Sequence, residues 1–195
     1  MSFDKVTLEG TAVKLEPMTP AHKDALIDIV KDGELWKLFF TSVPRPEEVA
    51  TYIRDAISRY ESGDGLPFVT IDKRSNRVVG STRFANADLA NKGVEIGYTF
   101  IGKSFQRSPV NTEAKLLMLS HAFETLNLNR VEFRTDFLNH NSRNAILRLG
   151  AREEGVLRCH KVMPDGRIRD TVVFSITKHD WCGVKQGLVH RLRTG

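Results

Sequence analysis

The chain has 195 residues, of which 41% are hydrophobic and 27% are charged, which suits one soluble globular domain and excludes a mainly disordered protein. Its formal charge of +5 has much of its excess in a basic C-terminal extension over about residues 178–195, and no aromatic-rich basic motif supports a nucleic-acid partner. With only two cysteines, no signal-peptide core and no run of eighteen apolar residues, we expect a cytoplasmic protein without a disulfide framework or a membrane partner.

The first third of the chain has the pattern of one strand followed by helices. Apolar residues alternate around Gly10, which indicates a strand with a turn or bulge at the glycine. Thr19-Pro20 then opens a helix, because threonine caps a helix well and proline is tolerated at its first position. The expected segments are a strand over residues 6–15 and helical segments over 20–30, 35–40 and 47–60.

The middle of the chain has the period of strands. Three strand-like runs cover residues 67–72, 78–85 and 94–101, and short polar stretches separate them. Consecutive strands with short connections predict an antiparallel meander.

The last third alternates between helices and strands. A helix is expected over residues 111–126, a strand over 131–136 and a short helix over 141–149, which Gly150 ends. Strands over 155–163 and 168–177 then flank an Asp-Gly hairpin turn. The whole order predicts a single α+β domain over residues 1–195. Its central sheet is mixed but mostly antiparallel, with about seven strands and helices on both faces.

The strand–loop–helix over residues 94–127 carries most of the functional signal. A helix start presents free backbone N–H groups and a partial positive charge, which together favour an anion. The approach loop adds side chains that donate hydrogen bonds well to phosphate oxygens. These donors are Lys103, Gln106, Arg107, Ser108, Asn111 and Thr112. The segment is therefore a candidate diphosphate site, although most helix starts bind nothing.

This segment, together with the order of elements, resembles the GNAT superfamily of acetyltransferases, and its Rim-type branch in particular. The resemblance covers nearly the whole chain and implies acetyl-CoA as the cofactor. In the family motif Q/R-x-x-G-x-G/A, which wraps the CoA pyrophosphate, Gln106 takes the first position. Pro109 and Asn111 stand where small residues are usual. Because proline has no N–H and asparagine has a side chain, we interpret the difference as altered cofactor binding, with Ser108 and Asn111 supplying side-chain donors.

A second resemblance lies at the exit of the strand over residues 131–136. Asn139, Ser142 and Leu149-Gly150-Ala151 match the Rim-type pattern N-x-x-S followed by L-G-A/F. The resemblance implies that Asn139 binds the pantetheine amides and that Ser142 lies near the CoA sulfur. Asn and Ser are also favoured helix caps, and a capping role is compatible with cofactor contact. The cofactor-binding residues implied are Phe100, Ile101, Gln106, Arg107, Ser108, Val110, Asn111, Thr112, Asn139 and Ser142.

Transfer from a thioester to an amine requires loss of a proton from the amine, donors for an oxyanion and a proton for the departing thiolate. Glu95 matches the position of the base glutamate in histone-acetylating family members. Alternatively, it is an ordinary solvent-facing strand residue and a water chain removes the proton. The family places the oxyanion donors at Phe100 or Ile101, and Ser142 is the expected thiolate acid.

The acceptor pocket is expected to include Trp36, Phe39, Phe84 and Tyr98, each of which could instead be core. Neither a metal-ligand spacing nor a nucleophile motif occurs, so we expect direct transfer to an amine. The leading hypothesis is an acetyltransferase acting on an α-amine of a protein or peptide. A small-molecule amine acetyltransferase and a non-catalytic acyl-CoA-binding module are the alternatives. The oligomeric state, monomer or homodimer, stays open.

Overall fold

The computed structural model describes residues 3–194, which form an eight-stranded sheet. The strand order is β1-β2-β3-β4-β5-β6-β8-β7, and every neighbouring pair is antiparallel except β5 with β6. The strands are β1 Leu8–Glu9, β2 Val13–Pro17, β3 Pro67–Asp72, β4 Arg77–Asp88, β5 Gly93–Ile101, β6 Arg130–Asp136, β7 Arg152–Val162 and β8 Ile168–Thr177. The expected mostly antiparallel sheet is confirmed, with one strand more than the sequence predicted.

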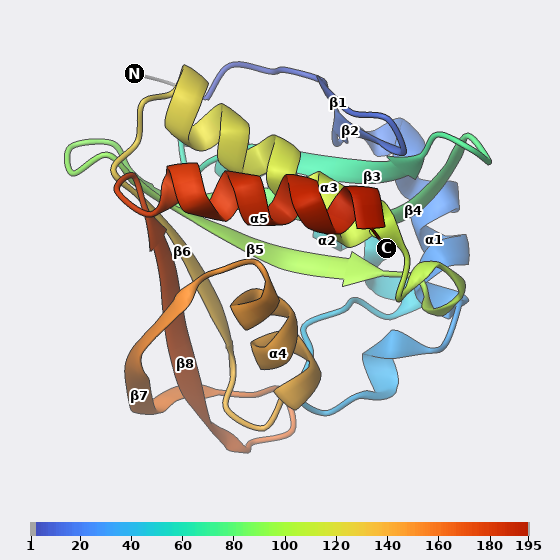
Figure 1. Ribbon diagram of the computed structural model, residues 1–195. Coiled ribbons are helices and arrows are strands. Elements are labelled where there is room, and N and C mark those ends of the chain that lie inside the picture. The colour runs from blue at the N-terminus through green and yellow to red at the C-terminus, as the bar shows by residue number, and fades with distance from the viewer. Residues whose placement is uncertain (1–2, 195) are drawn as a thin grey trace.

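Five α-helices cover the two faces of this sheet, as Figure 1 shows. One face carries α1 and α2, whereas α3, α4 and α5 lie on the other. The helices are α1 Lys23–Lys31, α2 Val49–Glu61, α3 Pro109–Ser120, α4 His140–Arg148 and α5 Trp181–Thr194, and a π-helical turn His121–Thr125 extends α3. None of the helices in this part of the chain has the length and apolar content needed to cross a bilayer.

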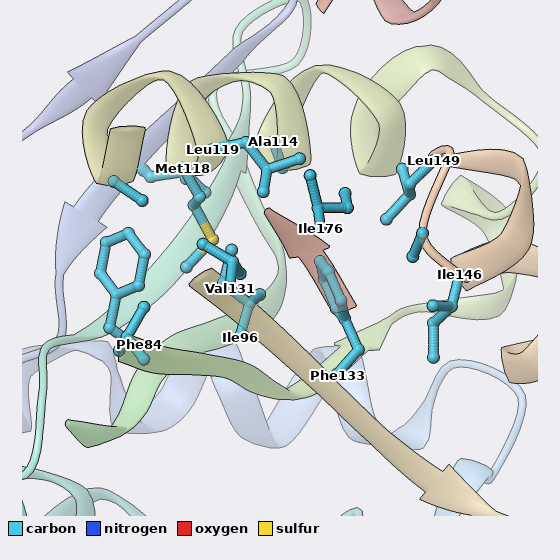
Figure 2. Close-up of a cluster of buried hydrophobic side chains, with 14 of the residues drawn as sticks. Phe84, Ile96, Ala114, Met118, Leu119, Val131, Phe133, Ile146, Leu149 and Ile176 are labelled. Carbon is cyan, nitrogen blue, oxygen red and sulfur yellow. The ribbon is translucent and has the colours of Figure 1, made fainter. Parts of the chain in front are cut away.

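The hydrophobic core has two parts, one on each face of the sheet. The larger part packs α3 onto the central strands, with Met118 and Leu119 against Phe84, Ile96 and Val131 (Figure 2). The smaller part packs α1 and α2 onto the opposite face of β3–β5. Alternate residues of β4 and β5 therefore face different helices, so the side chains of the α1/α2 face belong to a different environment from those beneath α3.

The strand expected over residues 6–15 is two short strands, because the chain folds back at the turn expected around Gly10 and forms the hairpin β1–β2. Glu113 on α3 lies under the turn and accepts the backbone N–H groups of Thr11 at 2.9 Å and of Ala12 and Val13 at 2.7 Å. A Cβ on Gly10 would lie 2.6 Å from the carboxyl carbon of Glu113, so a side chain at this position would displace the carboxylate that holds the turn. Helix α3 thus fixes the edge of the sheet as well as its centre.

Replacing Glu113 by alanine is expected to lower the free energy of unfolding by about 3 kcal/mol, because three N–H groups lose an ionised acceptor. Urea unfolding followed by circular dichroism measures the change. Glu153→Ala is the matched control, since within the described part of the chain Glu153 forms an ion pair only with Arg143, at 3.4 Å on the surface. It should cost less than about 0.5 kcal/mol. A loss below about 1 kcal/mol for Glu113→Ala would contradict the role assigned to this carboxylate.

The C-terminal segment is a helix packed on the domain, which corrects the expectation of a solvated basic extension. Helix α5 lies beside α3 (Figure 1), and its residues Trp181 and Leu188 are buried in the larger core. The indole Nε1 of Trp181 donates to Glu124 at 2.7 Å. The basic residues Arg191 and Arg193 of this helix are exposed, so charge alone did not reveal that the segment packs on the domain.

Candidate active site

The site begins where strands β5 and β6 separate. Within the described residues these two parallel strands pair only at Gly93–Arg130, Val94–Val131 and Glu95–Glu132. Strand β6 continues to Asp136 alongside β8, and β5 continues to Ile101 alongside β4. The backbone edge of β5 beyond Glu95 therefore faces a gap between the strands.

A bulge near the end of β5 determines which backbone groups face this gap. Four residues of β5, from Gly97 to Phe100, span the same length as the three residues from Arg83 to Ser81 of β4, and Tyr98 has a left-handed φ of 52°. Beyond the bulge, the N–H of Gly102 donates to Val79 at 2.9 Å.

Residue pairs across antiparallel strands alternate between hydrogen-bonded and non-hydrogen-bonded. The next pair, Ile101 with Gly80, is therefore not hydrogen-bonded, and the N–H and C=O of Ile101 point away from β4. Gln106 Nε2 donates to this C=O at 3.0 Å. Of the two oxyanion donors expected, Ile101 presents its N–H to the gap, whereas the N–H of Phe100 is directed toward Ser81 of β4.

The loop between β5 and α3 is held by Asp32, which follows α1. Its carboxylate accepts the backbone N–H of Ser104 at 2.9 Å and the hydroxyl of Ser104 at 3.0 Å. The backbone C=O of Asp32 accepts the N–H of Lys103 at 3.1 Å. Lys103 and Arg107 are exposed on this loop, so two cations precede the start of α3.

The start of α3 shows how the chain accommodates Pro109. Ser108 is the N-cap and Pro109 takes the first helical position, where a missing N–H costs the helix nothing. The hydroxyl of Ser108 donates to the C=O of Phe105 at 2.6 Å and accepts from the N–H of Val110 at 3.4 Å, so its proton is already used within the loop. Asn111 and Thr112 are half-buried in the first turn of the helix.

The side chain of Asn111 is compatible with an anion at this helix start. Its Oδ1 is buried and has no hydrogen-bond partner among the described residues. A half-turn of the amide exchanges Oδ1 for the donor Nδ2, which gives this position a hydrogen-bond donor at the helix N-terminus. The replacement of a small residue by Asn111 thus leaves a polar group there that the protein itself does not satisfy.

The second predicted motif lies at the start of α4. Asn139 is the N-cap, and its Oδ1 accepts the N–H of Ser142 at 3.0 Å. The capping role is thus present, and it leaves the Nδ2 of Asn139 as a donor. Both side chains are half-buried. Helix α4 follows β6 directly, so this motif lies beyond the end of the strand that borders the gap.

Glu95 is buried on the α1/α2 face of the sheet, which contradicts the alternative of a solvent-facing side chain. Asn86 Nδ2 donates to its carboxylate at 2.7 Å, and Arg134 Nε lies 3.8 Å from it. Burial raises the pKa of the Glu95 carboxyl above its ordinary value, and the hydrogen bond from Asn86 and the charge of Arg134 oppose that rise. A carboxylate with a raised pKa is a better proton acceptor near neutral pH.

The residues expected to line an acceptor pocket fall into two groups. Phe84 is 1% exposed and packs between Phe3, Phe68 and His121 in the larger core, so it is removed from the pocket. Phe84 pairs with Ile96 on β5, and both side chains face α3. Glu95 precedes Ile96, so its side chain lies on the opposite face of the sheet. Phe39 is exposed, whereas Trp36 and Tyr98 are half-buried.

The C-terminal hairpin connects the segment around Phe39 to β6. Arg167, in the turn between β7 and β8, lies over the ring of Phe39 at 5.2 Å and donates to its C=O at 3.4 Å. The same guanidinium is 2.5 Å from the fully buried carboxylate of Asp136, at the end of β6. Three distant segments therefore meet near the open end of the gap.

Two buried cations on β4 and α3 were missed by the sequence analysis. Arg83 is 4% exposed and stacks on Tyr52 of α2 at 4.8 Å and on Tyr98 at 4.1 Å. Lys115 of α3 donates to Thr82 and Thr99, both at 2.9 Å, and burial lowers the pKa of its amine to about 7. The available signal was a charge within an otherwise apolar run, as Arg83 is in the strand over residues 78–85. Within residues 3–194, no cluster of His, Cys, Asp and Glu has the arrangement of a metal site.

Comparison with known proteins gives a consistent picture. Residues 13–152 match the family model described as an acetyltransferase (GNAT) domain. A Bacillus subtilis (strain 168) protein that bears the provisional name ribosomal N-acetyltransferase YdaF is 32% identical over 93% of this chain and 98% of its own. A GCN5-related N-acetyltransferase from Brucella melitensis is 32% identical, with a TM-score of 0.87 over 98% of this chain and 87% of that one. RimJ of Mycobacterium smegmatis, solved with CoA-disulfide, shares the fold at 23% identity and a TM-score of 0.79, over 96% and 93% of the two chains.

Proposed function

The chain belongs to the GNAT family of acetyltransferases, in its Rim-type branch, and from this premise we propose that it transfers the acetyl group of acetyl-CoA to the α-amine of a protein or peptide. The observation that carries the proposal is the gap that opens beyond Glu95. There the free N–H of Ile101, the start of α3 and a buried carboxylate lie on successive parts of one strand–loop–helix.

The proposed cofactor site extends from the gap to the start of α3. Arg107, Asn111, Thr112 and the N–H groups of the first helical turn would hold the pyrophosphate, with Gln106 fixing the loop through its hydrogen bond to Ile101. Val110 and Ser108 supply the capped turn itself. On the other side of the gap, Asn139 Nδ2 would donate to the pantetheine arm and Ser142 would lie near the sulfur. The buried, partnerless Oδ1 of Asn111 supports an external ligand at this position.

When bound, acetyl-CoA supplies the acetyl group as a thioester. The N–H of Ile101 would stabilise negative charge that develops on the acetyl oxygen. Glu95 would accept a proton from the amine, directly or through water, and its raised pKa favours this role. Ser142 would donate a proton toward the leaving sulfur. Cys159 lies on β7 and Cys182 on α5, so neither residue is on the elements that border the gap, which supports direct transfer rather than a covalent enzyme intermediate.

The acceptor side supports a peptide over a small cationic amine. Phe39 is 53% exposed, and Trp36 and Tyr98 retain access to solvent, so the elements near Glu95 present an open aromatic surface. The charged groups that act on Glu95 are Arg134, Glu132 and Lys161, so the surroundings of this carboxylate are of mixed charge and not the acidic pocket that a polycationic amine would need. A small-molecule acceptor and a non-catalytic acyl-CoA-binding role are the outcomes that the following experiment separates from the proposal.

Calorimetry is expected to show micromolar binding of acetyl-CoA and at least about 10-fold weaker binding of S-acetylpantetheine, which lacks the pyrophosphate. Arg107→Ala should weaken acetyl-CoA binding several-fold, because a charge-assisted contact is lost. Arg74→Ala, in the distant turn between β3 and β4, is the matched control. A thiol-release assay over peptides with free N-termini, polyamines and amino acids should then show turnover with the peptides. Absence of heat with acetyl-CoA would overturn the cofactor assignment, and binding without turnover of any amine would leave only the acyl-CoA-binding role.

A further inference from the structure

Among residues 3–194, Arg83 has no anionic partner for its charge. Within residues 3–194 no carboxylate lies within ion-pair distance of it, and no oxygen accepts a hydrogen bond from its guanidinium. Its Nε is fully buried and unsatisfied. A buried guanidinium stays protonated, and leaving its donors unpaired is costly. The fold nevertheless holds it between the rings of Tyr52 and Tyr98.

The clamp around Arg83 is built from the irregular part of β5. The bulge gives Tyr98 its left-handed φ, and the Tyr98 ring stacks on the guanidinium at 4.1 Å. Tyr52 stacks on it at 4.8 Å, while its hydroxyl bonds to Ser81 Oγ at 3.1 Å. Stacking on two rings orients the plane of the guanidinium but uses none of its N–H donors.

Arg83 and Glu95 lie on the same face of the sheet, on neighbouring strands. Arg83 is opposite Gly97 and Glu95 is opposite Ala85, so the two charged residues form a diagonal pair with Cα atoms roughly 7 Å apart. Gly97 carries no side chain of its own, and a Cβ there would lie 2.6 Å from Glu95 Oε1, so the Glu95 carboxylate extends over this glycine, which is the residue opposite Arg83. The cation within ion-pair distance of the Glu95 carboxylate is Arg134, at 3.8 Å, and Arg83 is not among the charges that shift the pKa of Glu95.

We propose that Arg83 recognises a carboxylate of the acceptor, close to the amine that is acetylated. The inference rests on the proposed function and adds a substrate class to it: an amine with a carboxylate within about one residue's length. A carboxylate matches the fork of guanidinium donors in a bidentate arrangement. It can come from the side chain of a first-residue Asp or Glu in a peptide, or from the α-carboxylate of a free amino acid.

The test compares acceptors that differ only in charge, by calorimetric titration of the CoA-saturated protein. Glu-Ala-Ala-Ala amide is compared with Gln-Ala-Ala-Ala amide, and alanine with alaninamide, so the two pairs separate the two sources of carboxylate. We expect one carboxylate member to bind at least about 10-fold more tightly than its amide, because the amide leaves the guanidinium unpaired.

In Arg83→Met this preference should fall to about 1, through weaker binding of the carboxylate and unchanged binding of the amide. Arg83→Lys should retain part of the preference. Arg54→Met is the matched control, since Arg54 is an exposed residue of α2 whose guanidinium donates to Thr51 and to no other residue of the range 3–194. Acetyl-CoA binding and thermal unfolding should be normal in each variant used.

The wild-type comparison decides the question even if Arg83→Met does not fold. Equal binding of both members in both pairs, or no binding of any of the four, overturns the inference. So does an Arg83→Met protein that folds and keeps the preference. Failure of the proposed function has a different signature, which is the absence of acetyl-CoA binding or of thiol release with every amine.

Discussion

Replacing Glu95 by glutamine is expected to lower kcat/KM for the best peptide acceptor about 100-fold or more, because a positioned general base contributes at least that much. Glutamine keeps an oxygen that can accept from Asn86 Nδ2, so the strand and its neighbours should fold unchanged. A steady-state thiol-release assay measures the loss. Binding of acetyl-CoA should be the same in both proteins, since Glu95 lies on the α1/α2 face of the sheet and the proposed pyrophosphate site lies at the start of α3.

The pH dependence of the same reaction tests the role of Glu95 independently. Burial raises the pKa of Glu95 above 4.5, so kcat/KM of the wild type should fall as the pH drops below that raised pKa and the carboxyl becomes protonated. Glu95→Gln should lack this acidic limb. The remaining dependence then follows the α-amine of the acceptor, whose pKa is about 8.

Glu132→Gln provides the matched control for Glu95→Gln. Glu132 is the registered neighbour of Glu95 on β6, and its negative charge is one of the factors that raise the pKa of Glu95. The control should keep kcat within about 3-fold and move the acidic limb to lower pH, because the raising charge is gone. Full activity of Glu95→Gln would remove Glu95 from the base role and favour a water chain, with the family assignment unaffected.

Replacing Lys115 by methionine is expected to stabilise the protein at pH 7 by more than about 2 kcal/mol, which raises Tm by roughly 4 °C or more. Lys115 is fully buried, and burial lowers the pKa of its amine from 10.5 to about 7. Thr82 and Thr99 bond to each other at 2.8 Å, so their hydroxyls keep a partner when the amine is removed. Thermal and urea unfolding measure the gain.

The sign of the pH effect follows from proton binding. Between pH 7 and 10.5 the unfolded chain holds a proton on Lys115 that the folded chain has largely lost, so the stability of the wild type rises with pH in this window. Below pH 7 both states are protonated and the penalty is constant. The advantage of Lys115→Met should therefore be largest at or below pH 7 and should shrink as the pH approaches 9.

Lys37→Met is the control for Lys115→Met, since Lys37 is exposed and pairs only with Glu34. It should change stability by less than about 0.5 kcal/mol at every pH. Lys115→Arg should destabilise the protein, because arginine cannot lose its charge in the buried site. A Lys115→Met protein that is less stable than the wild type across the whole range would show that the two threonine contacts outweigh the cost of burying the amine.

Regular elements could be predicted well because their signals are local. The strand Pro67–Asp72 has the predicted bounds, and the helices around Leu26, Ile53 and Met118 follow their apolar stripes. The errors arose where a distant residue decides the local structure. The split into β1 and β2 on either side of the expected turn at Gly10 depends on Glu113, about a hundred residues away, and α5 depends on burial of Trp181 and Leu188. Periodicity within a short window contains neither contact.

The sequence by itself determined the α+β class, the order of elements and the family resemblance, because these depend on periodicity and on motifs around Gln106 and Asn139. Only the tertiary structure decided what each side chain meets. It buried Glu95 beside Asn86, moved Phe84 to the opposite face, and turned the N–H of Ile101 rather than that of Phe100 toward the gap. It also stacked Arg83 between two tyrosines without an anionic partner among the residues that the structure describes. The physical reason is that burial, strand register and a bulge set the face and the environment of a residue, and all three arise from pairing between segments distant in sequence.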